Sequence, residues 1–108
     1  MGVYSLSKLA MEIEFEVEDF IPLLHLFIDT TKEDLEGIRF AALRRDSTAV
    51  STCIHNIKGS SLNLGLGSIT ELLDQLSTLN KKGYYTDIEN IVQKCESELS
   101  NLEMLLES

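Results

Sequence analysis

The stretch DFIPLLHLFIDTTKEDLEGIRFAALRR, residues 19–45, decides the fold class of this chain. Apolar or small side chains recur along it at steps of three and four residues, the spacing of one face of an α-helix. This stripe is formed by Phe20, Leu24, Phe27, Thr31, Leu35, Ile38 and Ala42. The spacing predicts one long helix with Asp19 as its N-cap and Pro22 in its first turn. The charges of Arg44 and Arg45 suit its C-terminus.

A second stripe follows a short polar turn. Asp46 or Ser47 can accept a hydrogen bond from the free amides of a first helical turn, so a helix is expected to begin there. Its stripe is formed by Val50, Ile54, Ile57, Ser61 and Leu64. Gly65 is the expected stop, because glycine readily adopts the left-handed conformation that ends many helices.

Two more helices are predicted after Gly65. Residues 68–71 and 86–89 both have the spacing of a capping box, with Ser68 and Thr86 as the capping residues, and Gly83 is expected to end the first of these helices. The stripe of the first is Ile69, Leu72, Leu73, Leu76 and Leu79. The stripe of the second is Ile88, Ile91, Val92, Cys95, Leu99, Leu102 and Leu106.

The N-terminal segment completes the predicted fold. Residues 3–14 carry Val3, Leu6, Leu9, Ala10 and Ile13 at helical spacing. The alternation of acidic and apolar residues over 12–18 is interpreted as a connection, because it is brief and has no partner strand. The short connections favour consecutive antiparallel helices. We therefore expect one all-α domain over residues 1–108, an antiparallel up-down four-helix bundle with a short additional N-terminal helix.

Composition narrows the function classes. A chain of 108 residues fits one compact domain, and a formal net charge of -9 disfavours binding to nucleic acid or to an anionic membrane surface. Neither a 20-residue apolar stretch nor a signal-peptide pattern is present in the sequence, so a cytoplasmic protein is expected. Cys53 and Cys95 are isolated and are interpreted as small buried residues, and the scattered histidines and cysteines lack metal-ligand spacing.

His55 is the strongest candidate for chemistry. In a helix, Lys58 and Gly59 lie three and four residues beyond it and share its face, as do Ser51 and Thr52 one turn earlier. The ring lies about 100° from the buried stripe at the preceding position, so it should point toward the edge of the core or solvent. A cation and a missing side chain beside an imidazole suggest phosphoryl chemistry.

Gly59 needs an explanation of its own. A glycine inside a helix costs about 1 kcal/mol relative to alanine, and the following Ser60 and Ser61 are also weaker helix formers. Close packing between helices is one explanation, and access for a partner's phosphate is the other. His25 has neither a lysine nor a small residue one turn away, and it is interpreted as a boundary residue.

The run HNIKGSSLNLG, residues 55–65, closely resembles the signature of histidine-containing phosphotransfer (HPt) domains of two-component phosphorelays. The resemblance covers roughly residues 17–107. It implies a phosphohistidine carrier that accepts a phosphoryl group from the aspartate of one receiver domain and passes it to another. His55 would be the phosphoacceptor, Lys58 would provide phosphate electrostatics and Gly59 steric access. The supporting residues are Ser51, Thr52, Ser60 and Ser77.

The resemblance also implies partners and leaves alternatives. The partners are response-regulator receiver domains and a sensor or hybrid histidine kinase. No cofactor is expected on this chain, and Mg²⁺ is expected on the receiver. Nothing in the sequence resembles an ATP-binding domain, so no kinase activity is expected. Many family members carry Gln or Glu 22 residues after the histidine, where this chain has Ser77, so a water or the Ser51 hydroxyl would have to orient the ring. The alternatives are a catalytically silent helical interaction or dimerisation module and a domain of a larger kinase.

Overall fold

The computed structural model describes residues 5–107, and over this range it consists of α-helices without any strand. The helices are α1 (Leu6–Glu12), α2 (Val17–Leu43), α3 (Ser47–Asn63), α4 (Gly67–Lys82) and α5 (Tyr85–Glu107). The prediction of an all-helical chain is confirmed.

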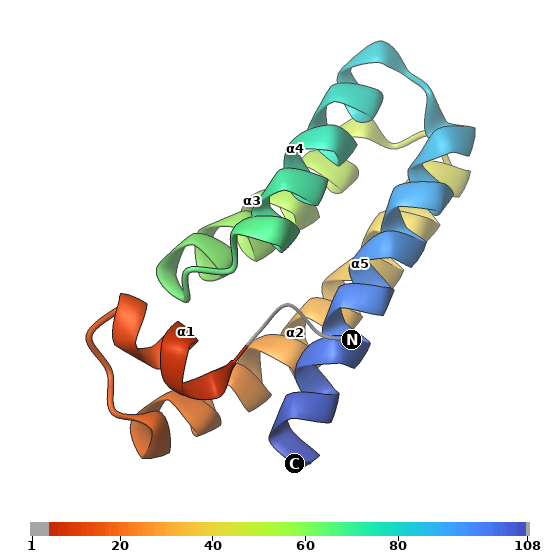
Figure 1. Ribbon diagram of the computed structural model, residues 1–108. Coiled ribbons are helices and arrows are strands. Elements are labelled where there is room, and N and C mark those ends of the chain that lie inside the picture. The colour runs from red at the N-terminus through yellow and green to blue at the C-terminus, as the bar shows by residue number, and fades with distance from the viewer. Residues whose placement is uncertain (1–4, 108) are drawn as a thin grey trace.

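Helices α2 to α5 lie alongside one another (Figure 1). Their buried side chains, with two from α1, form one hydrophobic core. Helix α2 packs against α3 and α5, and α4 packs against the same two helices. Every residue of the two stripes predicted in α2 and α3 is buried. In α4 and α5 the stripes are buried except for Leu72, Leu79 and Leu106, which are partly buried and pack against the core. The periodicity of the sequence therefore predicted the inner faces correctly.

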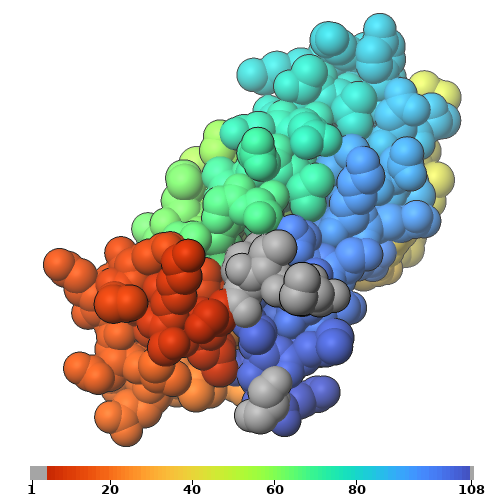
Figure 2. Space-filling model, viewed as in Figure 1, coloured from red at the N-terminus to blue at the C-terminus, as the bar shows by residue number. Residues whose placement is uncertain are grey.

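Helix α1 closes one end of the elongated molecule, whose principal extents are 41, 23 and 19 Å. It packs against α2 (Figures 1 and 2). Leu9 and Ala10 are buried. The helix is shorter than the predicted 3–14, because the chain leaves helical geometry after Glu12 and Glu14 adopts a left-handed φ of 60°. Val3 lies outside the described residues. Residues 13–16 connect α1 to α2, as the sequence suggested.

Helix α2 begins earlier than predicted. Its N-cap is Glu16, so Asp19 lies inside the first turn, and the prediction that Asp19 caps the helix is wrong. Pro22 is the sixth residue and lies in the second turn. The backbone hydrogen bond that it cannot donate would go to the carbonyl of Glu18, an exposed residue that water can reach.

The start of α3 and the ends of α3 and α4 were predicted more accurately, from an aspartate and two glycines, than the helix starts predicted from capping boxes. Asp46 caps α3 by accepting a hydrogen bond from the amide of Ala49 at 3.1 Å. Gly65 and Gly83 take left-handed φ angles of 70° and 74° and end α3 and α4.

The two predicted capping boxes are wrong. Helices α4 and α5 begin at Gly67 and Tyr85, so Ser68 and Thr86 lie inside them. The completely buried Leu66 is the N-cap of α4, and its carbonyl already accepts the backbone amide of Thr70 at 3.1 Å. Burial of Leu66 fixes the start of α4. A capping pattern in the local sequence contains no information on this burial.

Candidate functional site

His55 lies near the middle of α3 with its side chain exposed, between the buried residues Ile54 and Ile57. The predicted outward direction is confirmed. Its ring makes no hydrogen bond or ion pair with any residue in the range 5–107. The imidazole is therefore open to a partner but is not oriented by a neighbouring side chain.

Lys58 lies one turn further along α3 and extends toward α4. Its Nζ atom is 2.6 Å from Oδ1 of Asp74, and the two side chains are 41% and 57% exposed. A residue three positions along a helix has its Cβ about 5–6 Å from that of the first residue, so the Lys58 and His55 side chains leave α3 at neighbouring positions. The ammonium is held by a carboxylate of α4, and the role of Lys58 beside His55 stays a prediction.

Asp74 was not identified from the sequence. The sequence feature that could have identified Asp74 is its position three residues before Ser77, which puts both residues on the same face of α4. Successive contacts between α3 and α4 lie farther and farther from the turn that joins the two helices. Ser61 Oγ lies 2.8 Å from Thr70 Oγ1, and the next pair along is Lys58 and Asp74. One more turn in each direction pairs the level of His55 with that of Ser77.

Ser77 is half-buried, and its hydroxyl makes no hydrogen bond to His55 among the described residues. A serine side chain is shorter than the Gln or Glu that the resemblance leads one to expect at this level. The hydroxyl of Ser51, the other candidate, is exposed and likewise has no bond to the ring. Neither hydroxyl bonds directly to the imidazole among the described residues, and orientation of the ring through a water stays a prediction.

Gly59 lies beside open space. A Cβ atom built on it would meet nothing within 4 Å outside its own helix backbone. Gly37 of α2 behaves in the opposite way, because a Cβ there would lie 3.0 Å from Sγ of Cys53. Close packing between helices explains Gly37 and does not explain Gly59.

The other two predicted supporting residues donate hydrogen bonds from their hydroxyls to backbone carbonyls of α3. Thr52 Oγ1 donates to the carbonyl of Thr48 at 3.0 Å, and Ser60 Oγ donates to that of Asn56 at 3.3 Å. These hydroxyls lie on the exposed side of α3, and neither bonds to the His55 ring. His55, Lys58 and Gly59 form the candidate site, with these residues at its edge.

An apolar hollow of about 520 Å³ lies between α2 and α3, next to this site. Asn56 and Ser60 line its α3 side, and three exposed apolar side chains lie along its other side: Phe15, Leu23 and Leu26. Around α3, Asn56 lies about 100° from His55 in one direction and Lys58 about 60° in the other. The imidazole therefore lies between the hollow and the ion pair. The sequence patterns missed these apolar residues because they lie off the core stripes.

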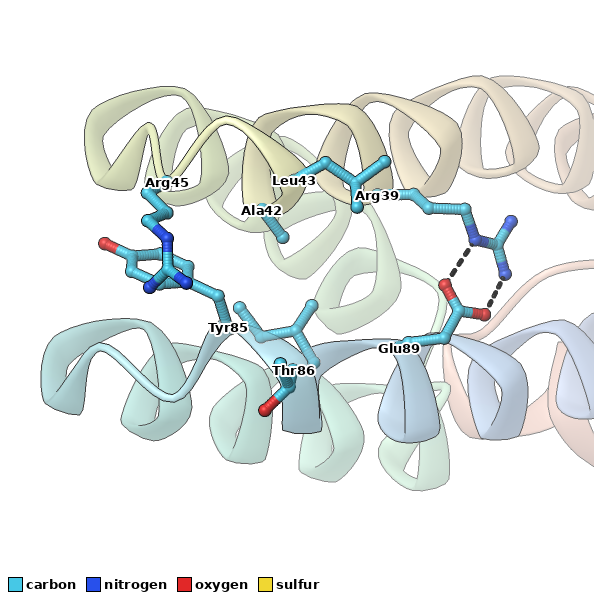
Figure 3. A pocket seen from close by; sticks show the side chains of 8 residues that line it. Arg39, Ala42, Leu43, Arg45, Tyr85, Thr86 and Glu89 are labelled. Atoms are coloured by element: carbon cyan, nitrogen blue, oxygen red, sulfur yellow. Dashed lines mark hydrogen bonds and ion pairs between the residues drawn. The ribbon is translucent and has the colours of Figure 1, made fainter.

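A second hollow, of about 410 Å³, lies between α2 and α5 (Figure 3). Arg39 donates to both carboxylate oxygens of Glu89 there, at 2.6 and 2.7 Å. Near the other end of the hollow, the Arg45 guanidinium lies 5.9 Å from the centre of the Tyr85 ring. The Arg39 contact joins α2 to α5, and the Arg45 contact joins the turn between α2 and α3 to the first residue of α5.

The remaining candidates take no part in the site. Burial raises the pKa of the Cys95 thiol to about 12, and burial together with Asp34 raises that of the half-buried Cys53. His25 is exposed on α2 and does not lie at the boundary of the core. Within residues 5–107 there is no cluster of three or more potential metal ligands, and none of their helices is long and apolar enough to span a membrane.

The sequence was compared with protein-family models, with curated proteins and with solved structures. The family model described as the Hpt domain matches residues 22–105, which is more than half of the chain. A search of the curated proteins and a search of the solved structures each returned no significant match. The matched range begins in the second turn of α2, ends within the last turn of α5 and contains the whole candidate site. The resemblance stated from the sequence is confirmed.

Proposed function

Because the chain belongs to the Hpt domain family, which performs phosphotransfer in two-component signalling, we propose that it is a phosphohistidine carrier. It accepts a phosphoryl group from the aspartate of one receiver domain onto His55 and passes it to the aspartate of another. The observation that carries this proposal is the combination on one exposed face of α3: an unpaired imidazole, the ammonium of Lys58 and the open space at Gly59.

The transfer needs no general base on this chain. In a neutral imidazole one ring nitrogen has a free lone pair. That lone pair forms the N–P bond while the P–O bond to the aspartate breaks, and the electrons of the broken bond stay on the carboxylate. The ring becomes a cation that carries the phosphoryl group, so no proton has to move. Reversal of the same step onto a second aspartate completes the relay.

Lys58 and the partner share the electrostatic work. Phosphoryl transfer depends mainly on alignment and on neutralising the charge of the phosphoryl oxygens. Lys58 supplies one positive charge beside the acceptor ring. We expect the receiver to supply Mg²⁺ and its own cation, and we expect no cofactor on this chain.

The apolar hollow supports a receiver domain as the docking partner. Phe15 and Leu26, which line the hollow, are 43% and 61% exposed. Exposed apolar side chains that cluster at one place commonly mark an interaction surface. A receiver docked here would bring its aspartate over His55, with Gly59 leaving space for its loops.

The proposal includes the scaffold and the setting of the protein. Helices α2 to α5 would form an antiparallel up-down bundle with α1 as an addition at one end, as in the predicted fold. The partners would be receiver domains and a sensor or hybrid histidine kinase in the cytoplasm. The acidic net charge of -9 supports the expectation that the domain contacts neither nucleic acid nor membrane.

Phosphotransfer profiling tests the proposal. The purified protein is incubated with each phosphorylated receiver domain of the source organism, and labelling is expected to give an acid-labile, alkali-stable bond. The variant His55→Gln should lose the label, whereas His25→Gln, which changes the other exposed histidine, should keep it. ATP alone should give no label. Absence of label with every receiver, or full label on His55→Gln, would overturn the proposal.

A catalytically silent interaction module is the second candidate. It is favoured by the absence of any hydrogen bond from Ser77 to the His55 ring among the described residues. Such a module would bind its partner with an affinity that His55→Ala leaves unchanged, and no receiver would label it. A titration that measures the partner affinity of the wild type and of His55→Ala, together with the phosphotransfer profiling, separates the two functions.

A further inference from the structure

Asp74 is the one carboxylate in residues 5–107 that forms an ion pair with Lys58. The pair joins α3 to α4 one turn from His55, with an N–O distance of 2.6 Å and both side chains about half exposed. Ser77, on the same face of α4, is too short to take the ring-orienting place expected from the resemblance. The nearest acidic group on α4 is thus directed at the lysine, and not at the imidazole.

We propose that Asp74 is a positioning residue that competes with the phosphoryl group on His55 for the ammonium of Lys58, and so lowers the fraction of His55 that is phosphorylated at equilibrium. This inference rests on the proposed function. In the free protein the lysine is held toward α4. After transfer, the doubly charged phosphoryl group attracts the same ammonium and repels the carboxylate, so either the ion pair breaks or three charged groups crowd together.

The consequence is a carrier that gives up its phosphoryl group readily. When Asp74 draws the Lys58 ammonium away from the phosphoryl group, the phosphohistidine becomes less stable relative to the aspartyl phosphate of a receiver. An exposed ion pair has a small interaction energy, so we expect the effect on the equilibrium to be about twofold to fivefold. The effect should act through Lys58 and should leave the fold unchanged.

The test is the equilibrium distribution of phosphoryl groups between this protein and one receiver that labels the wild type. Asp74→Asn should raise the ratio of phosphorylated to free His55 by about twofold to fivefold, and Asp74→Glu should bring it back toward the wild-type value. In a Lys58→Ala background, Asp74→Asn should have a smaller effect, because only direct repulsion remains. Glu103→Gln is the matched control, since it removes an exposed carboxylate from the Lys32 pair between α2 and α5.

The outcomes separate this inference from the proposed function. A wild-type protein that no receiver labels would overturn the proposed function and the inference with it. A labelled wild type whose ratio is unchanged or lowered by Asp74→Asn would overturn the inference alone. An equal effect of Asp74→Asn with and without Lys58 would also overturn it, because the carboxylate would then not act through the lysine. Thermal unfolding and receiver affinity, measured on the same variants, should not change.

Discussion

Two ion-paired cations of this molecule show how differently the same kind of charge is used. Lys58 on α3 pairs with Asp74, its one carboxylate partner within residues 5–107, and both side chains are about half exposed. Arg39 on α2 is 26% exposed and is bound by Glu89 and Glu96 of α5 and by Glu36 of its own helix. The arginine is enclosed in a network that joins two helices, whereas the lysine keeps a hydrated charge that a new anion can attract.

The chemistry of the two side chains fits these roles. A guanidinium presents several donors in a fixed plane and suits a carboxylate bound through two bonds, as Glu89 is bound to Arg39. The hydrogen bonds that Arg39 donates to Glu89, and then those to Glu96, raise the pKa of Arg39 further above its usual range. An ammonium on a flexible stem is a point charge that can change partner. The comparison predicts that Arg39 matters for folding and Lys58 for transfer.

Removal of Arg39 should have the largest effect on stability. The variant Arg39→Met leaves Glu36, Glu89 and Glu96 close together without their common cation, and we expect a loss of about 1–2 kcal/mol in the free energy of unfolding. Urea unfolding followed by circular dichroism measures this loss. Phosphotransfer at a temperature where the variant is folded should remain near the wild-type rate. A stable Arg39→Met variant would remove the structural half of the comparison.

Removal of Lys58 should have the complementary effect. Lys58→Met keeps the length of the side chain, so the free energy of unfolding should change by less than about 0.5 kcal/mol. The rate of transfer to His55 should fall by about tenfold, since an exposed charge contributes less to transition-state stabilisation than a buried donor. Single-turnover transfer from a phosphorylated receiver measures the rate. A variant that transfers normally but unfolds easily would reverse the roles of the two cations.

The two glycines sharpen the comparison further, because one packs and one is open. Gly59→Ala should stabilise the protein by up to about 1 kcal/mol, since alanine favours the helix and its methyl group meets nothing. The same change should slow transfer from a receiver. Gly37→Ala, the matched control, should be less stable than wild type, because its methyl group crowds the sulfur of Cys53. Slower transfer without loss of stability in Gly59→Ala would identify the open space as functional.

The sequence predicted well those features that depend on periodicity along one helix. The stripes of α2 and α3 are buried throughout, and His55 points outward because Ile54 and Ile57 point inward. Features that depend on two helices were not predicted. Asp74 becomes a neighbour of Lys58 only when the register of α3 against α4 is known, and the network around Arg39 needs the register of α2 against α5.

Helix starts were predicted poorly for a related reason. The polar residues Asp19, Ser68 and Thr86 have the right chemistry for caps, and each lies inside its helix. At α4 the completely buried Leu66 is the N-cap, so the helix begins before Ser68. The local preference of a cap is about 1 kcal/mol, which the burial of one large apolar side chain can exceed.

Acid titration should give the smallest effect and tests the same network. Arg39, and then Gln93, lower the pKa of Glu89 below its ordinary value of 4.5. The stabilisation linked to this group is therefore complete above about pH 4.5 and is lost as the pH falls through the lowered pKa. The difference in unfolding free energy between wild type and Arg39→Met should shrink over that interval by less than about 1 kcal/mol, because the groups are partly exposed. Urea unfolding of both proteins at pH 7 and near pH 3 measures the change, and a difference that stays constant would mean that Arg39 stabilises the protein by packing and not by charge.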